Sequence, residues 1–149
     1  MSTGRPAPAD AARLILFHKQ DTSARVRFLR HIGGGVSLPG PLPSLCEIVD
    51  EDEAPDLKVV AHPSLYLAQA ERWLGLEPGA LALEPEFRSW VELTGGPVPV
   101  YLGRFTSIDP PFAAAEAVGC AFITIMEGRD LRPVELELLR RAYQLVLGG

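Results

Sequence analysis

Hydrophobic and polar positions alternate over two short runs near the N-terminus. Residues 13–19, "RLILFHK", and 24–32, "ARVRFLRHI", are apolar or alternating, and the polar stretch "QDTS" separates them. A period of two residues is typical of β-strands, because successive side chains point to opposite faces. The pattern predicts two strands joined by a turn, and a helix over residues 9–18 is the competing interpretation.

The next stretch is dominated by residues that break regular structure. Residues 33–45, "GGGVSLPGPLPSL", contain four Gly and three Pro. We therefore expect a loop with at most one short extended piece, at residues 36–38. Six acidic residues follow between positions 47 and 56, and a solvated loop is the simplest interpretation of them. Residues 57–61, "LKVVA", predict a short buried strand.

A helical period begins at residue 62, in "HPSLYLAQAERWLGL". Pro63 suits the first helical position, and Gly75 suits the left-handed residue that ends a helix. At 100° per residue the apolar side chains fall within one arc of about 120°. They are Tyr66, Leu67, Ala70, Trp73 and Leu74. The pattern predicts a helix whose stripe faces the core.

The C-terminal half begins with a hairpin pattern. Residues 87–93 and 100–108 flank "TGGP", whose glycines can adopt the positive φ angles of a tight turn. Pro97 and Pro99 lack a backbone donor, so the second strand either starts after Pro99 or lies at a sheet edge there. Gly103 indicates a bulge or a close backbone approach.

Three further elements follow. Residues 109–119 predict a short helix, and the continuous apolar run 120–126 predicts a central strand covered on both faces. Residues 133–147 predict the clearest helix. Its apolar face is broad and must be covered by a sheet, a partner subunit or both, so a homodimer through this helix is plausible. That face comprises Val134, Leu138, Leu139, Ala142, Tyr143, Leu145 and Val146.

Size and charge restrict the function classes. The 149 residues suffice for one α/β domain, over residues 10–149, behind a loose tail of residues 1–9. A net charge of −5 gives no general attraction for nucleic acid or anionic lipid. No secretory signal and no run of about 20 apolar residues is present, so we expect a cytoplasmic protein without a membrane segment. Cys46 and Cys120 are expected to be buried thiols.

One cluster has the composition of an anion site. Arginines supply bidentate donors and glycines allow backbone N–H groups to approach an oxyanion. The residues concerned are Arg25, Arg27, Arg30, Gly33, Gly34 and Gly35. The alternative is a flexible connection beside an exposed basic strand face, because the cluster matches neither a P-loop nor a dinucleotide fingerprint.

The order of these elements, with "VSLPG" at 36–40, "GL" at 75–76 and "VYLGRF" at 100–105, resembles the Nudix hydrolase superfamily. The resemblance covers about residues 13–147. It implies an α/β (α+β) fold in which a mixed β-sheet is packed between helices.

The family's catalytic signature is missing from the matching helix. If Gly75 and Leu76 end the signature, Ala68 and Gln69 replace its Arg-Glu pair, and Arg72 and Trp73 replace its Glu-Glu pair. In the family those glutamates bind the divalent cations that support pyrophosphate hydrolysis. Glu71 is one position away, about 100° around the helix. We therefore expect standard hydrolysis to be lost, and we count Gln69 and Arg72 among the candidate ligand contacts.

The sequence thus predicts a non-catalytic Nudix-like protein that binds a small nucleotide-like ligand or a protein, without a cofactor. The alternative is a metal-dependent hydrolase of nucleoside diphosphate derivatives, with Mg²⁺ held at a nonstandard site by Glu47, Asp50 and Glu71. A structural subunit of a larger complex is a third hypothesis.

Overall fold

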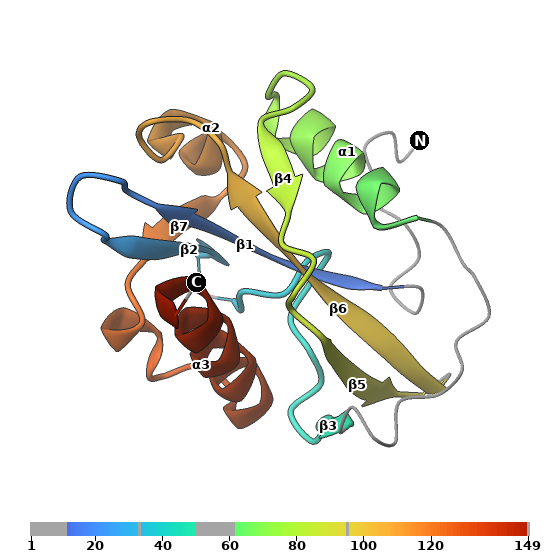
Figure 1. Cartoon of the computed structure of the whole chain (residues 1–149). Coiled ribbons are helices and arrows are strands. Elements are labelled where there is room, and N and C mark those ends of the chain that lie inside the picture. The colour runs from blue at the N-terminus through green and yellow to red at the C-terminus, as the bar shows by residue number, and fades with distance from the viewer. Residues whose placement is uncertain (1–11, 33, 50–61, 95, 149) are drawn as a thin grey trace.

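Strands of one mixed sheet make up the centre of the molecule, with helices on both faces (Figure 1). The computed structural model describes residues 12–32, 34–49, 62–94 and 96–148. The strands are β1 (Arg13–Lys19), β2 (Val26–His31), β3 (Glu47–Val49), β4 (Leu81–Leu83), β5 (Ser89–Leu93), β6 (Gly96–Phe105) and β7 (Cys120–Ile123). The helices are α1 (Pro63–Leu74), α2 (Phe112–Ala117) and α3 (Pro133–Gly148), with a 3-10 turn, η2, at Met126–Gly128.

The strand order is β3-β5-β6-β1-β2-β7, and β4 pairs with the C-terminal part of β6. β1 and β6 run parallel, with Arg13 opposite Val100, whereas the other pairs are antiparallel. The predicted α+β class with a mixed sheet between helices is therefore confirmed.

β1 shows how the sheet separates two hydrophobic layers. Its side chains alternate, so that Ile15 and Phe17 pack with α3, whereas Leu14 and Leu16 pack with α1 and α2. We call these layers the α3 cluster and the α1 cluster. Both faces of β1 are buried, which explains its nearly continuous apolar sequence.

The sheet opens between β1 and β2 at one end. β2 pairs with β1 only at Phe17–Lys19, and Leu38 pairs with Leu14 near the start of β1. The Gly/Pro segment therefore lies beside the half of β1 that β2 does not cover. Of the short extended piece predicted at residues 36–38, only the bridge at Leu38 forms, because Val36 and Ser37 lie in a bend.

The helix predicted after residue 62 is confirmed as α1. The His62 side chain accepts a hydrogen bond from the Ser64 N–H, and Gly75 ends the helix at a φ of 70°. Gly103 of β6 is where the sheet and α1 approach closely, because an added Cβ would lie 2.8 Å from side-chain atoms of both Leu16 and Leu67.

The hairpin of β5 and β6 is confirmed, and its prolines lie inside the second strand. The ladder with β5 includes Pro97 and Pro99, while β1 pairs with β6 only from Val100 onward. At both prolines β6 therefore pairs with one described strand only, β5. This is the second of the two predicted arrangements, in which the prolines lie at a sheet edge.

One expectation about strands needs correction, one falls outside the described residues, and two strands were not predicted. The run 120–126 is not a central strand: β7 ends at Ile123, lies at the end of the strand order and exposes Ala121. β3 and β4 were not predicted. The strand expected at 57–61 lies outside the described residues.

The broad apolar face of α3 is covered mainly by the sheet. Val134, Leu138, Leu139, Ala142 and Val146 are buried in the α3 cluster. A homodimer through α3 stays a prediction, although the sheet now accounts for most of the feature that suggested it.

The two cysteines are free thiols. Cys120 is buried as expected, but Cys46 is only half-buried, because it lies just before the edge strand β3. No described helix is long and apolar enough to cross a bilayer.

Candidate functional site

A cavity of about 190 Å³ lies between α1 and the open end of the sheet. One wall is a helical face of α1, formed by Tyr66, Gln69, Ala70 and Trp73. Because these residues are three or four positions apart, they share one side of the helix. The stripe predicted for the core is therefore mostly buried, and two of its members, Tyr66 at 8% exposure and the partly buried Trp73, also line the cavity.

The opposite wall comes from three separate segments. Arg13 and Leu14 begin β1 just after Ala12, His31 ends β2, and Leu38 and Pro39 belong to the segment beside β1. These segments meet only because β2 leaves the first half of β1 uncovered. Spacing along the sequence therefore gave no sign of this wall.

His31 contributes a ring to the cavity. Its centroid lies 5.5 Å from that of Trp73, with the two planes inclined by 40°. Its Nδ1 is 3.7 Å from Cys120 Sγ, and its buried Nε2 has no hydrogen-bond partner in the described part of the chain. Burial lowers the pKa of His31, which the negative charge of Glu135 partly opposes. The imidazole is therefore neutral at pH 7.

Cys120 is not an activated thiol, although it contacts His31. Burial raises the pKa of Cys120 to about 11, so the thiol stays protonated at neutral pH. Only the thiolate is strongly nucleophilic. The Cys120 and His31 pair thus forms an uncharged part of the site rather than a catalytic dyad.

Arg13 is the charged residue of the cavity wall, and its guanidinium donates to the Gly40 carbonyl over 2.7 Å. Burial lowers the pKa of Arg13, and Glu135 opposes the shift. Among the described residues that line the cavity, none is Asp or Glu. The wall is therefore mostly apolar and aromatic.

The signature positions of α1 have different surroundings. Gln69 and Trp73 line the cavity, whereas Arg72 is exposed. The carboxylate of Glu71 is buried, and its Oε2 accepts hydrogen bonds from the Gly79 and Leu81 N–H groups over 3.0 and 2.9 Å. Glu71 thus ties the end of α1 to β4.

The alternative hypothesis places Mg²⁺ among Glu47, Asp50 and Glu71. This ion prefers several oxygen ligands around one point. Glu47 is exposed on β3 opposite Glu92, and Asp50 lies outside the described residues. Within the described ranges, no three His, Cys, Asp or Glu residues are grouped so that they could hold a metal ion. The alternative ligand set includes Asp50, so that metal site stays a prediction.

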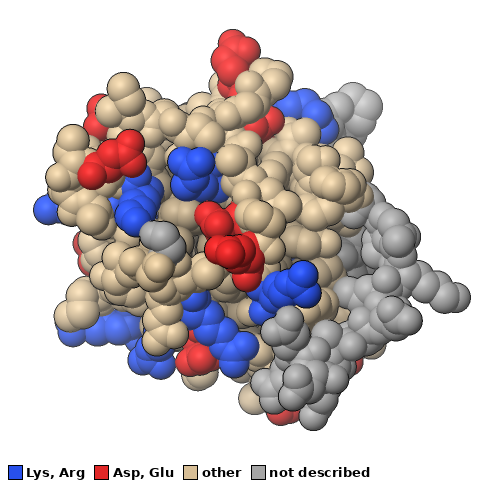
Figure 2. Space-filling view, viewed as in Figure 1, with Lys and Arg blue, Asp and Glu red and all other residues tan. Residues whose placement is uncertain are grey.

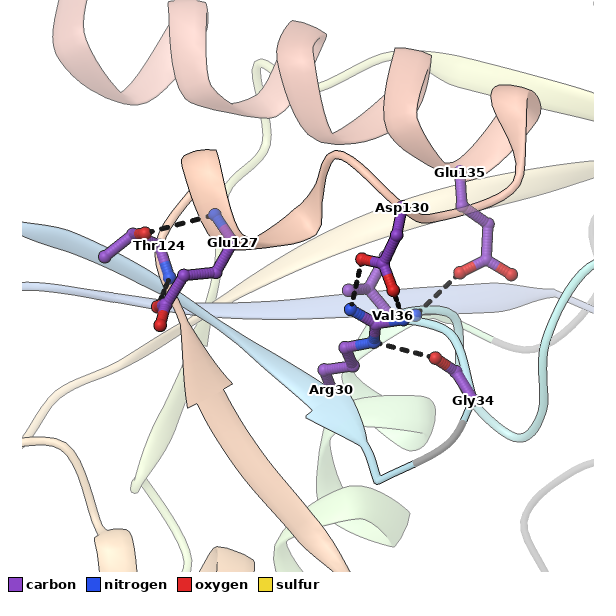
Figure 3. A network of polar contacts seen from close by, with 7 residues as sticks. All are labelled: Arg30, Gly34, Val36, Thr124, Glu127, Asp130 and Glu135. Atoms are coloured by element: carbon purple, nitrogen blue, oxygen red, sulfur yellow. Dashed lines mark hydrogen bonds and ion pairs between the residues drawn. The ribbon is translucent and has the colours of Figure 1, made fainter.

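The arginines of the predicted anion cluster lie apart. Arg25 is exposed in the turn before β2, and Arg27 stacks over the Phe112 ring at 5.6 Å. Arg30 points to the other face of β2, where it donates to both oxygens of Asp130 and to the Gly34 carbonyl (Figure 3). The hydrogen bond from Arg30 also lowers the pKa of Asp130.

The glycine segment of that cluster is held by an internal carboxylate. Glu135 of α3 is 1% exposed, and its Oε1 accepts hydrogen bonds from the Val36 and Ser37 N–H groups over 2.6 and 3.4 Å. Its Oε2 accepts from the Leu42 N–H over 2.7 Å. A Cβ on Gly35 would lie 2.1 Å from Oε1, and Gly33 lies outside the described residues. Glu135 could not be foreseen, because its partners are more than 90 residues away.

Comparisons with known proteins add little. No protein-family model and no curated protein matches the chain. Among solved structures, the crystal structure of C. elegans Ap4A hydrolase, a Nudix enzyme, is similar over 91% of this chain and 98% of that chain. The identity is 11% and the TM-score 0.48, which is too low to support a conclusion about activity. The case for a function therefore rests on the chain's own geometry.

Proposed function

We propose that this chain is a non-catalytic binding protein that takes a small, uncharged planar ring, such as the base of a nucleotide-like ligand, in the cavity beside α1. The observation behind the proposal is the chemistry of the wall. Tyr66, Trp73 and His31 line the cavity with aromatic rings, and Leu14 and Leu38 line it with apolar surface. Ring faces of this kind stack on any planar π-system.

The size of the cavity sets the size of the occupant. Sites for drug-sized ligands measure about 300–1,000 Å³. The 190 Å³ available here therefore suit one ring system rather than a whole nucleotide. A sugar or phosphate attached to the ring would extend outside the cavity.

Catalysis of phosphoanhydride cleavage needs charges that the wall does not supply. Such a reaction uses divalent cations to neutralise the phosphates and to activate water. Here the helix presents Gln69, Ala70 and Trp73 to the cavity, and Glu71 is engaged by backbone N–H groups of the following turn. Binding without hydrolysis is the function that these contacts favour.

The two tryptophans provide a matched test. Trp73 lines the cavity, whereas Trp90 lies on β5 beside a different hollow. We expect purine and pyrimidine bases and their nucleosides, titrated by calorimetry, to include a binder that Trp73→Ala weakens about tenfold, since stacking on one ring contributes ~1–3 kcal/mol. Trp90→Ala should bind as the wild type does. No binder in the panel, or equal losses in both variants, would contradict the proposal.

Two assays separate the rival hypotheses. With Mg²⁺ or Mn²⁺ and a panel of nucleoside diphosphate derivatives, we expect no turnover; metal-dependent turnover that Glu47→Gln or Glu71→Gln abolishes would favour the hydrolase. A purely structural subunit would show no thermal shift with any base. A ligand at a hundred times its Kd should instead add about 2.7 kcal/mol of stability.

A further inference from the structure

One short segment connects the two faces of the sheet. Val36 and Leu42 pack in the α3 cluster, whereas Leu38, between them, packs in the α1 cluster and lines the cavity with Pro39. The segment thus has both ends against α3 and its middle against the proposed ligand site.

Contacts on both faces fix this segment. On the α3 side, Glu135 accepts from the Val36, Ser37 and Leu42 N–H groups, and Figure 3 shows its side chain reaching from α3 toward Val36. On the cavity side, Leu14 and Leu38 exchange backbone hydrogen bonds of 3.2 and 2.8 Å. Residues 36–42 are therefore held at both ends by one carboxylate and in the middle by β1.

The carboxylate has little freedom to adapt. Hydrogen bonds from N–H groups to a buried carboxylate are stronger than neutral ones, and loss of the acceptor leaves buried donors unpaired. The close approach of Gly35 to Glu135 also leaves no room for a side chain. We therefore expect a change at Glu135 to move the segment, of which Leu38 and Pro39 are part.

We infer that Glu135 is a positioning residue for the cavity: although it lies on the other face of the sheet, it sets where the Leu38–Pro39 wall stands. Its effect on ligand affinity rests on the proposed function, whereas its effect on the wall does not. Because coupling between two sites is reciprocal, a ring bound in the cavity should also strengthen the contacts of Glu135.

Two acidic residues of the same helix give the first experiment. Glu135→Gln removes the charge that holds the segment, and Glu137→Gln changes a partly exposed side chain that pairs with Arg141. With adenine as the probe, we expect Glu135→Gln to raise the Kd at least about fivefold, and Glu137→Gln to leave it unchanged. The indole N–H signal of Trp73 should shift in the ligand-free Glu135→Gln protein.

A control variant is needed to show that lowered stability alone does not raise the Kd or shift the indole signal. Val146→Ala truncates a buried residue near the other end of α3 and supplies a destabilised control with an intact Glu135. A Kd and an indole signal that move as much in Val146→Ala as in Glu135→Gln would overturn the inference. If adenine does not bind the wild type, the proposed function fails for this probe, and the indole signal still decides the role of Glu135.

Two further variants cover the case in which Glu135→Gln does not fold. Gly35→Ala places a Cβ against the carboxylate, so it should shift the same indole signal. From the cavity side, Leu38→Ala should speed amide exchange at Val36 and Leu42 relative to Val91. Unchanged exchange at both amides would overturn the inference.

Discussion

Two buried glutamates that could have suggested chemistry serve as acceptors for backbone N–H groups. Glu71 is 7% exposed and Glu135 is 1% exposed, and each accepts from a segment rich in Gly and Pro. Such segments have few internal hydrogen bonds of their own, so buried N–H groups need a side-chain partner. At both positions the carboxylate completes the structure of a turn.

Glu71 allows this interpretation to be measured. In Glu71→Ala the N–H groups of Gly79 and Leu81 lose their acceptor, so we expect the free energy of unfolding to fall by about 1–3 kcal/mol. Urea denaturation of the wild type and the variant would give the difference.

The matched control is Glu77→Ala, an exposed acid in the turn that follows α1. Its effect should stay within about 0.5 kcal/mol. Equal stabilities of Glu71→Ala and the wild type would show that water or another group replaces the carboxylate without cost.

The sequence could not indicate these roles. Period and spacing place Glu71 on a helix and Glu135 in a first helical turn. They do not indicate which backbone N–H groups each side chain reaches. The same holds for the candidate site. The sequence shows that Gln69 and Trp73 stand where the signature has glutamates. It does not show the cavity that these residues line, because that cavity also needs His31 and the Leu38–Pro39 wall.

At the scale of elements, local signals predicted the boundaries well where they were strong. Pro63 and Gly75 bracket α1, and Pro133 begins α3, because each residue favours its position at a helix end. β3 and β4 have three residues each, too few for a periodic pattern, and form only by pairing with β5 and β6. For β7 the apolar composition was misleading, since an edge strand can be apolar where α2 and η2 pack beside it.

Gly75 gives a test of a helix boundary. Its φ of 70° is the left-handed conformation that costs residues with a Cβ about 1–2 kcal/mol, and no atom lies within 4 Å of an added Cβ. We expect Gly75→Ala to destabilise the protein by roughly 1 kcal/mol through the backbone alone, as measured by thermal unfolding.

Gly40→Ala is the control, because Gly40 has free space around its Cα and no positive φ. Equal melting temperatures of the two variants would indicate that α1 ends elsewhere in solution.

At the scale of the whole molecule, the charges do not form a surface of one sign on the face that Figure 2 shows. Lys and Arg are interspersed with Asp and Glu there, and the chain as a whole has a charge of −5. That a polyphosphate backbone is not the partner stays a prediction from the net charge. The cavity and α3 lie on opposite faces of the sheet, and the segment 36–42 connects them.

The oligomeric state is the property for which the structure most changes the expectation from sequence. The apolar face of α3 that suggested a homodimer packs against the sheet, and the exposed side of the helix offers Arg140, Gln144 and Leu147. A stable interface buries about 1,200–2,000 Å² with an apolar centre, which one exposed leucine does not provide. We therefore expect no dimer through α3 at micromolar concentration, as measured by light scattering coupled to size exclusion. A dimer that Leu147→Glu converts to a monomer, without a change in melting temperature, would restore the homodimer through α3 and show that its outer face is sufficient for association.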